Sequence, residues 1–596
     1  MARLVSQNVA TRGHPRRRQA VTLWASLGLG LALPATASAQ TAVGALPAVP
    51  PGNPIPRVAP RAAPSVSPGL QGLPATPPGG PVPNVPVAVA TASVEGATAF
   101  TPARLARITA GLTGPAVPLP RIAAARLAIL DLYRRHGYVL TAVSATLDAA
   151  HHLHFIVTEG RVVAVKLSGD IGPAGTQVLR FLHHLTQVRP ITSAALERWL
   201  LLAQDIPGVS IRAVLQPSST EPGALTLIAQ VQRSPVSGLI TADNRAFQNT
   251  GPDEGLAVFD LNSFTSLGEK TEISLYHTDG NTQNFGQIAE SFFVGGSGLR
   301  VRLYGGAGHA DPSGELAAIG YQGITTVFGA EVSYPLIRAR QQTLNLRAAF
   351  DAIEAQIFTG GGPGGGKVLS SDDSLRVFRL EADYVSTDLW AGVGRSAVNS
   401  LSLRFSQGVP LFGAAHNGDL QASRLNERVD FWKINGSFSR TQTLFAPWPA
   451  ATVALKGMVA GQVTSDVLPT SEEFFLGGAD FTRGFYSGEV TGDNALAATA
   501  ELQLNTGLQV HLFGHPFQVA AQFYGFYDWG ETWQNQKTDA NHRVSSAGGG
   551  VRLFLSRYTE FDLEAVARMT RHVDANTTTV KPLSADAVYW RVLARF

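Results

Sequence analysis

The residue patterns best suited to chemistry are a glycine-rich run and two groups of histidines. Residues 361–367 read Gly-Gly-Pro-Gly-Gly-Gly-Lys, which superficially resembles a phosphate-binding loop. Such a loop needs Ser or Thr after the lysine to bind magnesium, but Val368 stands there and Pro363 interrupts the run. We therefore interpret this run as a flexible loop and predict no cofactor.

The histidines could suggest a metal site, because imidazole is a common zinc ligand. One group is His151, His152 and His154, and the other is the pair His183 and His184. Neither group has a carboxylate or a cysteine at ligand spacing, so we interpret both as solvated and predict no metal. The chain has no cysteine and no Gly-x-Ser-x-Gly elbow, which removes two further routes to catalysis. We predict no catalytic residue and no enzyme.

Charge and composition narrow the class of protein. The 596 residues are 15% charged and 44% hydrophobic, whereas an average soluble domain is about 25% charged. The net charge is +3, but five arginines and no acidic residue lie within the first 39 residues, so the remainder carries −2. That balance gives no electrostatic basis for binding nucleic acid.

The first 39 residues read as an export signal. An arginine-rich start leads into an apolar stretch from Ala20 to Leu33, followed by Ala37-Ser38-Ala39. Small residues in this arrangement are typical of a cleavage site, and the apolar stretch is shorter than the roughly 20 residues of a membrane helix. We predict a signal peptide at 1–39 and an exported protein.

A proline-rich segment follows at 40–85. Fourteen prolines lie between Thr41 and Ala90 at irregular spacing. Proline removes backbone donors and fixes φ, so we expect an extended tether of polyproline character with neither helix nor sheet.

Two α+β modules of about 75 residues come next, at 86–160 and 161–233. Each predicts the order β-α-α-β-β. The first begins with one alternating strand from Val87 to Val94. Tyr138–Thr146 in the first module and Val209–Leu215 in the second are candidate edge strands.

From residue 234 to 596 the pattern changes to short alternating segments between clusters of Gly, Asn, Asp and Ser. In the last segment, Val588, Trp590, Val592, Ala594 and Phe596 face one way and Arg591 and Arg595 face the other. One apolar and one charged face predict a transmembrane antiparallel β-barrel with lipid outside and water inside. Sixteen strands would give about 23 residues for each strand with its connection.

The order of these parts resembles the TpsB transporters of two-partner secretion, the ShlB/FhaC/HecB-like group of the superfamily of outer-membrane assembly barrels. The small modules then resemble polypeptide-transport-associated (POTRA) domains. The motifs that carry the resemblance are Leu132-Tyr133-Arg134-Arg135-His136-Gly137-Tyr138-Val139, Thr158-Glu159-Gly160-Arg161, Phe474-Phe475-Leu476-Gly477-Gly478, Thr482-Arg483-Gly484-Phe485, Gly492-Asp493-Asn494, Phe526-Tyr527-Asp528-Trp529-Gly530 and the final Phe596.

The resemblance implies roles for residues in the barrel. Arg483, Gly484 and Phe485 would form the tip of a long sixth loop that folds back into the lumen. Asp528, from a Phe-x-Asp-x-Gly motif ending at Gly530, would be the partner of Arg483 on the inner wall. A bidentate Arg–carboxylate pair can fix such a loop, and we expect Gly484 to permit a turn there.

The resemblance also bears on three further positions. Thr482 replaces the family's usual valine, and because both are β-branched we expect no difference. Trp590 and Phe596 would belong to the C-terminal signal read by the barrel assembly machinery.

The implied function is export of an unfolded partner exoprotein, TpsA-like, from the periplasm through the outer membrane of a Gram-negative bacterium without ATP. Its partners would be this substrate, outer-membrane lipid and the assembly machinery, with no nucleic acid. Tyr133, Gly137, Tyr138 and Val209 are the candidate POTRA residues for binding the substrate.

The sequence alone is also compatible with two other functions. An outer-membrane insertase of the same superfamily shares the barrel and loop motifs, and a porin shares the barrel. Members of the family often carry an N-terminal helix as a plug. Because the N-terminal segment here is rich in proline, we expect either no plug or an extended chain in the pore.

Overall fold

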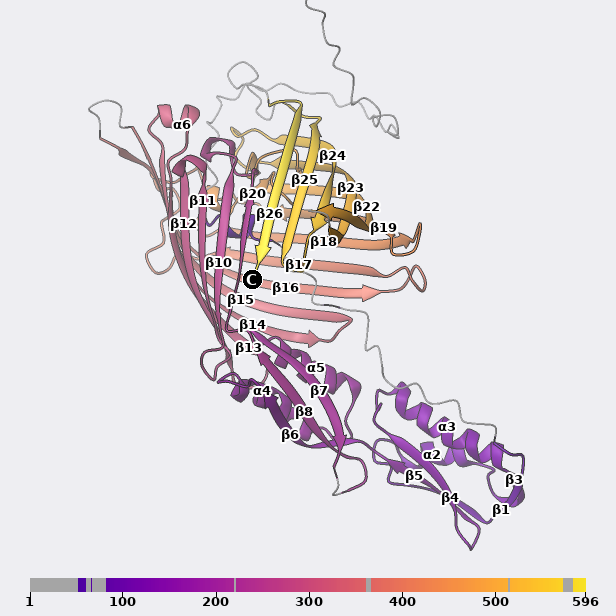
Figure 1. Ribbon diagram of the computed structural model, residues 1–596. Helices are drawn as coiled ribbons and strands as arrows, with labels where there is room; N and C mark the ends of the chain where they lie inside the picture. The colour runs from indigo at the N-terminus through magenta and orange to yellow at the C-terminus, as the bar shows by residue number, and fades with distance from the viewer. Residues whose placement is uncertain are drawn as a thin grey trace, which may run out of the picture. The chain divides into compact units, whose positions relative to one another are not determined.

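The computed structural model describes residues 52–60, 66, 82–218, 221–360, 366–512, 515–571 and 583–596. These residues form two small α+β domains followed by a closed antiparallel β-barrel, which confirms the predicted fold class (Figure 1). The predicted signal peptide, most of the proline-rich segment and most of the glycine-rich run lie outside the described residues.

The helices are α1 (Ile55–Val58), α2 (Pro102–Thr109), α3 (Leu119–Arg135), α4 (Gly175–His183), α5 (Ser193–Gln204) and α6 (Gly314–Ala318), with 3-10 turns η1 (His184–Thr186), η2 (Gln248–Thr250), η3 (Asp279–Asn281) and η4 (Thr470–Glu472). The strands of the small domains are β1 (Pro86–Val89), β2 (Thr91–Glu95), β3 (Gly114–Pro118), β4 (Ala142–Leu147), β5 (His152–Thr158), β6 (Arg161–Gly169), β7 (Val209–Pro217) and β8 (Ala224–Arg233).

The barrel strands are β9 (Val236–Asp243), β10 (Glu254–Asn262), β11 (Lys270–Thr278), β12 (Gln283–Val294), β13 (Leu299–Ala310), β14 (Gln322–Arg338), β15 (Gln342–Thr359), β16 (Val368–Asp388), β17 (Ala397–Gly408), β18 (Trp432–Phe445), β19 (Thr452–Val463), β22 (Asn494–Leu512), β23 (His515–Trp533), β24 (His542–Phe554), β25 (Thr559–Arg568) and β26 (Asp586–Arg595). A separate hairpin is made by β20 (Phe474–Leu476) and β21 (Val490–Gly492).

The first small domain contains one more strand pair than expected. Its main sheet has the order β2-β5-β4, and helix α3 packs on it through buried residues such as Ile129. The predicted strand from Val87 to Val94 is divided at Ala90, and β1 pairs with β3 instead of joining the main sheet. Prolines lie at the ends of this short pair, which is where a strand tolerates the loss of an N–H donor.

The second small domain follows its prediction closely. Its sheet has the order β6-β8-β7, with α4 and α5 supplying Phe181, Leu182 and Ala203 to a fully buried core. Both strands named as candidate edges, β4 in the first domain and β7 here, lie at an edge of their sheets.

Sixteen strands close the barrel, as predicted, and β26 completes it by pairing with β9 from Arg591–Asp243 to Arg595–Leu239. Side chains alternate along each strand: Leu401 and Leu403 on β17 are 46% and 52% exposed on the outer face, while Ser406 is fully buried. This is the period of 2 that a lipid-facing strand requires. None of the helices in the described ranges has the length and apolar character needed to span a bilayer.

Helix α1 corrects the expectation that the proline-rich segment forms no helix. Ile55 and Val58 pack against a cluster on the barrel strands that includes Leu256 and Phe285. Proline occupies the first turn of this helix, where its missing N–H costs nothing, and Asn53 accepts a hydrogen bond from the Ile55 N–H at 2.9 Å. A single helical turn is therefore compatible with this composition.

The loops that carry the site lie at the end of the barrel opposite the end at which β9 begins. Three of them matter below: the fifth loop (residues 409–431), the sixth loop (464–493) and the seventh loop (534–541). The sixth loop contains η4, β20 and β21, and thus has the length to fold back on the barrel.

Candidate functional site

The sixth loop is held against the inner wall by a small apolar core. Phe485 is fully buried and clusters with Phe481 and Leu476 of the loop and with Ala497 and Val544 of the wall. The hairpin of β20 and β21 brings the two halves of the loop together. The tip that carries Arg483 is thereby pressed onto strands β22 to β25.

Arg483 binds Asp528 of β23 through its backbone and its side chain. The Arg483 N–H and Nε each donate to Oδ2 of Asp528 at 2.9 Å, and Nη2 donates to Oδ1 at 3.0 Å. The side chain of Arg483 is 5% exposed and that of Asp528 is 0% exposed. The two residues named from the motif are therefore in contact, in the bidentate geometry that makes such pairs strong.

The guanidinium also has partners that the motif did not indicate. Its Nη1 donates to Glu501 of β22 and lies 3.7 Å from Glu564 of β25, and its Nη2 donates to Thr499 at 3.0 Å. It stacks on the Phe526 ring, 3.6 Å from the centroid. One cation thus joins three carboxylates and an aromatic face, where loss of water strengthens each interaction.

A second arginine supports the tip from the other side. Arg245, just after β9, donates to the carbonyl of Arg483 at 2.6 Å and to Glu564 at 2.5 Å, and lies 4.0 Å over the Tyr589 ring. The carbonyl of Gly484 accepts hydrogen bonds from Arg568 and from Tyr589 at 3.0 Å. The tip is therefore fixed by main-chain as well as side-chain contacts along consecutive wall strands.

Gly484 and Gly530 are required for close approach. A Cβ at Gly484 would lie 2.6 Å from Cβ of Ser546, and one at Gly530 would lie 2.9 Å from Leu476 of the loop. Any larger side chain at either position would push the loop off the wall. The positive φ at this turn is at Thr482 (φ 52°), two residues before Gly484.

Thr482 makes hydrogen bonds that a valine could not, so the expectation of no difference between the two residues was wrong. Its hydroxyl accepts the Gly477 N–H at 2.8 Å and donates to the Phe481 carbonyl at 2.7 Å. A valine has the same branched shape but can make neither bond. These two bonds hold a β-branched residue in a sterically unfavourable left-handed conformation.

The rest of the lumen is lined by paired charges. Arg379 joins Asp351 of β15 to Glu472 of the sixth loop, with Nε and Nη2 each 2.6 Å from a carboxylate oxygen. Glu472 also lies 2.7 Å from Lys433. The sixth loop is therefore tied to the wall near its start as well as at its tip.

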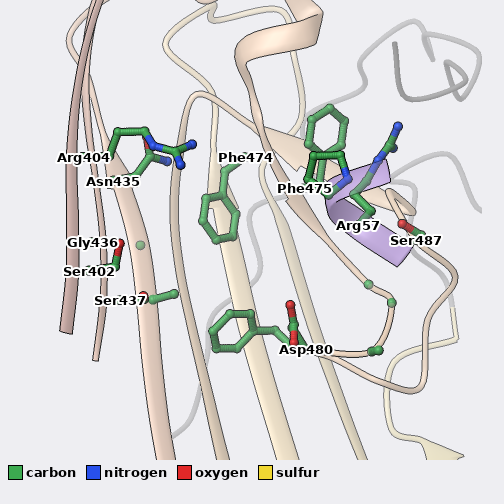
Figure 2. Close-up of a pocket in the computed structure, with 17 residues that line it drawn as sticks. Arg57, Ser402, Arg404, Asn435, Gly436, Ser437, Phe474, Phe475, Asp480 and Ser487 are labelled. Atoms are coloured by element: carbon green, nitrogen blue, oxygen red, sulfur yellow. The ribbon is translucent and has the colours of Figure 1, made fainter. Parts of the chain in front are cut away.

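A cavity of about 420 Å³ lies between helix α1, the sixth loop and the wall strands β17 to β19. Figure 2 shows Ser437 and Asn435 on one side of it and Phe474 on the other. Arg57 of α1 stacks on Phe475, 5.4 Å from the ring centroid. On the side opposite the wall strands, the space is closed by helix α1 and the sixth loop, and neither of these pairs as a strand with the barrel in the described residues.

The candidate POTRA residues are placed as structural elements of their domains. Tyr133 is fully buried and donates to Glu159 Oε1 at 2.6 Å, which leaves no side-chain surface for a partner. Tyr138 stacks edge-on to Phe100 and Tyr133, and Gly137 has the positive φ (84°) that follows helix α3. These residues support the fold of the first domain.

In the second domain, the remaining candidate lies on an edge strand. Val209 begins β7, but its side chain is only 8% exposed and belongs to the core. The backbone of Val209 therefore lies at the edge of the sheet, whereas its side chain points into the core.

The two C-terminal residues lie at the strand that closes the barrel. Phe596 exchanges backbone hydrogen bonds with Gly238 of β9 at 3.0 and 3.1 Å, and its ring lies 5.9 Å from Phe259. The Trp590 N–H donates to the side chain of Asn244 at 2.9 Å.

One histidine has carboxylate neighbours that sequence spacing did not reveal. His154 Nδ1 lies 2.7 Å from Glu95, and Nε2 lies 3.6 Å from Asp148. The Glu95 contact raises the pKa of His154, with a second contribution from Asp148. In the ranges that the structure covers, no group of three or more His, Cys, Asp and Glu residues is placed to hold a metal ion.

POTRA-like domains, a sixteen-strand barrel and an inward-folded loop pinned by Arg483 together define an outer-membrane transport barrel. The family model described as "Haemolysin secretion/activation protein ShlB/FhaC/HecB" matches residues 225–553, more than half of the chain. The model of the "POTRA domain, ShlB-type" matches residues 87–160. The chain belongs to this TpsB family, which confirms the resemblance found in its motifs.

Known proteins share this architecture at low sequence identity. The outer membrane transporter CdiB of Escherichia coli is 22% identical over 541 residues, which cover 85% of this chain and 82% of that protein. The solved structure of CdiB from Escherichia coli has a TM-score of 0.65 at 19% identity and covers 90% of this chain and 94% of its own. That of CdiB from Acinetobacter baumannii has a TM-score of 0.59 at 14% identity, with 89% and 94% covered.

These findings place the protein in the outer membrane, with its POTRA domains in the periplasm. The end of the barrel at which β9 begins is therefore periplasmic, because β9 directly follows the second domain. The fifth, sixth and seventh loops lie at the extracellular end.

Proposed function

We propose that this protein exports one partner exoprotein, in an unfolded form, from the periplasm to the cell surface without ATP. The observation that carries the proposal is the sixth loop, which is held inside the lumen by charge pairs and a small apolar core and not by strand pairing with the barrel. Such a loop can leave the wall while the barrel stays closed in register. A passive porin has no use for this arrangement or for periplasmic domains.

The POTRA domains would receive the exoprotein first. In the described residues, no further strand pairs with the outer side of β4 or β7, although the side chains of Arg126 and Gln204 donate to the carbonyls of Val143 and Ile211. An extended polypeptide can add to such an edge as a further strand, with main-chain hydrogen bonds giving affinity. The burial of Tyr133 and Val209 favours this mode over recognition by their side chains.

The lumen would then carry the extended chain past the sixth loop. Its lining includes paired charges and small polar groups such as Arg404 and Ser437, which offer hydrogen bonds to an extended chain. Release of Arg483 from Asp528 would free the loop tip. Because this pair is buried, its separation requires water or the passing chain to replace its hydrogen bonds.

The direction of transport would come from folding of the exoprotein outside the cell, because a folded domain cannot return through the lumen. A fold-blocked exoprotein should therefore leave the periplasm much more slowly than the normal one. Normal export of the blocked form, measured by surface labelling, would contradict this source of direction.

During biogenesis the barrel would be inserted into outer-membrane lipid by the barrel assembly machinery, which would read the C-terminal strand. The exposed Phe596 beside the strand that closes the barrel fits this role.

The test of the proposed function compares secreted proteins by mass spectrometry between the wild type and a strain lacking this chain, with outer-membrane proteins measured in parallel. We expect one large protein to vanish from the medium while other barrels stay at normal levels. A broad fall in outer-membrane barrels with no single lost exoprotein would instead assign an insertase function.

A further inference from the structure

Arg424, in the fifth loop, is the centre of a second charge cluster, distinct from that of Arg483. Its Nη1 donates to Asp493 at 2.6 Å and to the Leu468 carbonyl at 2.8 Å. Its Nη2 donates to Asp539 at 2.9 Å and to Gln534 at 3.0 Å. The first two partners belong to the sixth loop and the last two to the seventh, so one side chain joins three extracellular loops.

The carboxylate of Asp493, at the centre of this cluster, accepts hydrogen bonds from several groups. Asp493 is 0% exposed and accepts hydrogen bonds from the backbone N–H groups of Leu468 and Asn535, both at 2.8 Å, as well as from Arg424. It therefore links the start and the end of the sixth loop to the seventh loop. Its position in the Gly492-Asp493-Asn494 run is explained by this junction.

Arg424 is the cation that balances the negative charges of three carboxylates in this cluster. Besides Asp493, the guanidinium lies 3.2 Å from Glu473 and 2.9 Å from Asp539. The side chains of Asp493 and Glu473 are 0% and 4% exposed, so without the cation two buried carboxylates would face each other in a poorly hydrated site. Such a pair repels strongly, and the loops that carry it would separate.

The fifth loop has its own anchor on another part of the wall. Its residues Val429 and Phe431 are buried against Leu375 and Val377 of β16 and Leu468 of the sixth loop. The fifth and seventh loops begin after β17 and β23, which are separated in barrel order by β18, β19 and β22. Arg424 therefore connects separate parts of the barrel rim.

We propose that Arg424 is an outer clasp, which holds the fifth, sixth and seventh loops together at the extracellular exit and must release before a polypeptide can leave. The Arg483 cluster fixes the loop tip to the inner wall, and the Arg424 cluster fixes the loop base to neighbouring loops. This inference deepens the proposed function and rests on it where export is concerned, but closure of the exit can be measured without any exoprotein.

The first test measures ion conductance of the purified full-length protein in planar lipid bilayers. We expect Arg424→Gln to raise the fraction of time in the open state by at least about tenfold, because the loops lose their shared cation. Arg428→Gln is the matched control, since Arg428 lies in the same loop with a side chain 49% exposed, pairs with Asp430 at 2.8 Å and approaches Asp466 of the sixth loop only to 3.8 Å. Wild-type conductance in a folded Arg424→Gln barrel would overturn the proposal.

The second test closes the clasp covalently, and it applies even if Arg424→Gln does not fold. Asn426 of the fifth loop and Gln536 of the seventh are exposed and lie in hydrogen-bond contact at 3.3 Å. Because the chain has no native cysteine, Asn426→Cys with Gln536→Cys gives a unique pair for a short thiol cross-linker in intact cells. We expect the linked protein to stop releasing the exoprotein, while each single cysteine variant treated in the same way releases it normally.

The two ways of failing are distinguishable. If the fully cross-linked protein still releases the exoprotein, the clasp is overturned and the proposed function stands. If a strain lacking the chain loses no exoprotein at all, the proposed function fails, and the conductance of Arg424→Gln against Arg428→Gln still decides whether the clasp closes the exit.

Discussion

The barrel lumen and the second POTRA domain both bury large side chains, but with opposite chemistry. In the POTRA domain, Phe181, Leu182 and Leu185 are fully buried among other apolar groups. In the lumen, the side chains of Arg483, Glu501 and Asp528 are 5%, 1% and 0% exposed and bind one another. One interior excludes charge and the other is held together by it.

This difference in buried chemistry indicates which contacts can break without unfolding a domain. Apolar packing is spread over many small contacts and is lost only when the domain unfolds. A charge cluster has a few strong bonds, and one broken partner leaves the other uncompensated. The barrel strands keep their own hydrogen bonds in either case, so we expect a rearrangement to involve the lumen contacts and not the POTRA cores.

The largest effect is expected from reversing the charge at the loop tip. Arg483→Glu places a carboxylate beside Asp528, Glu501 and Glu564, and loses about 3–5 kcal/mol of loop docking. We expect export to fall at least tenfold while the barrel still migrates as a folded, heat-modifiable band on a gel. Arg543→Glu makes the same change at a side chain that is 60% exposed and should export normally. Equal export by both variants would contradict the role of the cluster.

A substitution that creates a cavity in the second POTRA domain tests whether apolar packing holds that domain together. Phe181→Ala should cost about 3–5 kcal/mol of domain stability, which exposes residues 161–233 to hydrogen exchange and lowers export. Leu179→Ala lies on the same helix at a position 42% exposed and should change neither. Slow exchange in the Phe181 variant would mean that this core is not the source of the domain's stability.

The fifth loop offers a pH test of buried charge outside the membrane. Burial, together with the negative charge of Asp373, raises the pKa of Glu427 from 4.5 to about 7. Since the folded loop then binds the proton more tightly than the unfolded loop, its stability is highest below pH 4.5 and falls as pH rises through 7. Proteolysis of the fifth loop should therefore be faster at pH 8 than at pH 5.5.

The control for this effect is neutralisation of the same site. Glu427→Gln cannot ionise and should be cleaved at a rate that depends less on pH, whereas Asp419→Asn, at an exposed site of the same loop, should behave as the wild type. Digesting all three proteins side by side at each pH removes the protease's own pH dependence. A persistent pH effect in Glu427→Gln would assign it to another group.

The smallest effect is expected at Tyr133. Tyr133→Phe removes the hydrogen bond to Glu159 but keeps the buried ring, at a cost of about 1–2 kcal/mol. Hydrogen exchange over residues 86–160 should rise modestly and export should remain near normal. A strong export defect with unchanged exchange would restore Tyr133 as a contact for the partner.

Much of the architecture could be predicted from the sequence because its signals are local. Alternation along segments such as 588–596 indicated a barrel strand, and the predicted order β-α-α-β-β is the order of elements in the second POTRA domain. The strand pair β1–β3 was missed because its pairing partners lie about 30 residues apart and are bounded by prolines.

The candidate site was predicted only in part, because its partners come from distant strands. The motif indicated Arg483 and Asp528, but Glu501 and Glu564 lie on strands, and Arg245 just after a strand, that meet only when the barrel closes. The one available signal was their charge on the lumen-facing side of an alternating strand. For helix α1, proline content predicted an extended chain, but proline in the first turn is compatible with a helix.

The central claim, that the exoprotein passes through this lumen, can be tested by photo-crosslinking from two adjacent residues of β18. Ser437 lines the lumen cavity, and Phe438 is 47% exposed on the lipid-facing side (Figure 2 labels Ser437). A photoreactive amino acid at Ser437 should capture the exoprotein in cells during export, and one at Phe438 should not. Ongoing export with no adduct at Ser437, or equal adducts at both positions, would contradict passage through the barrel.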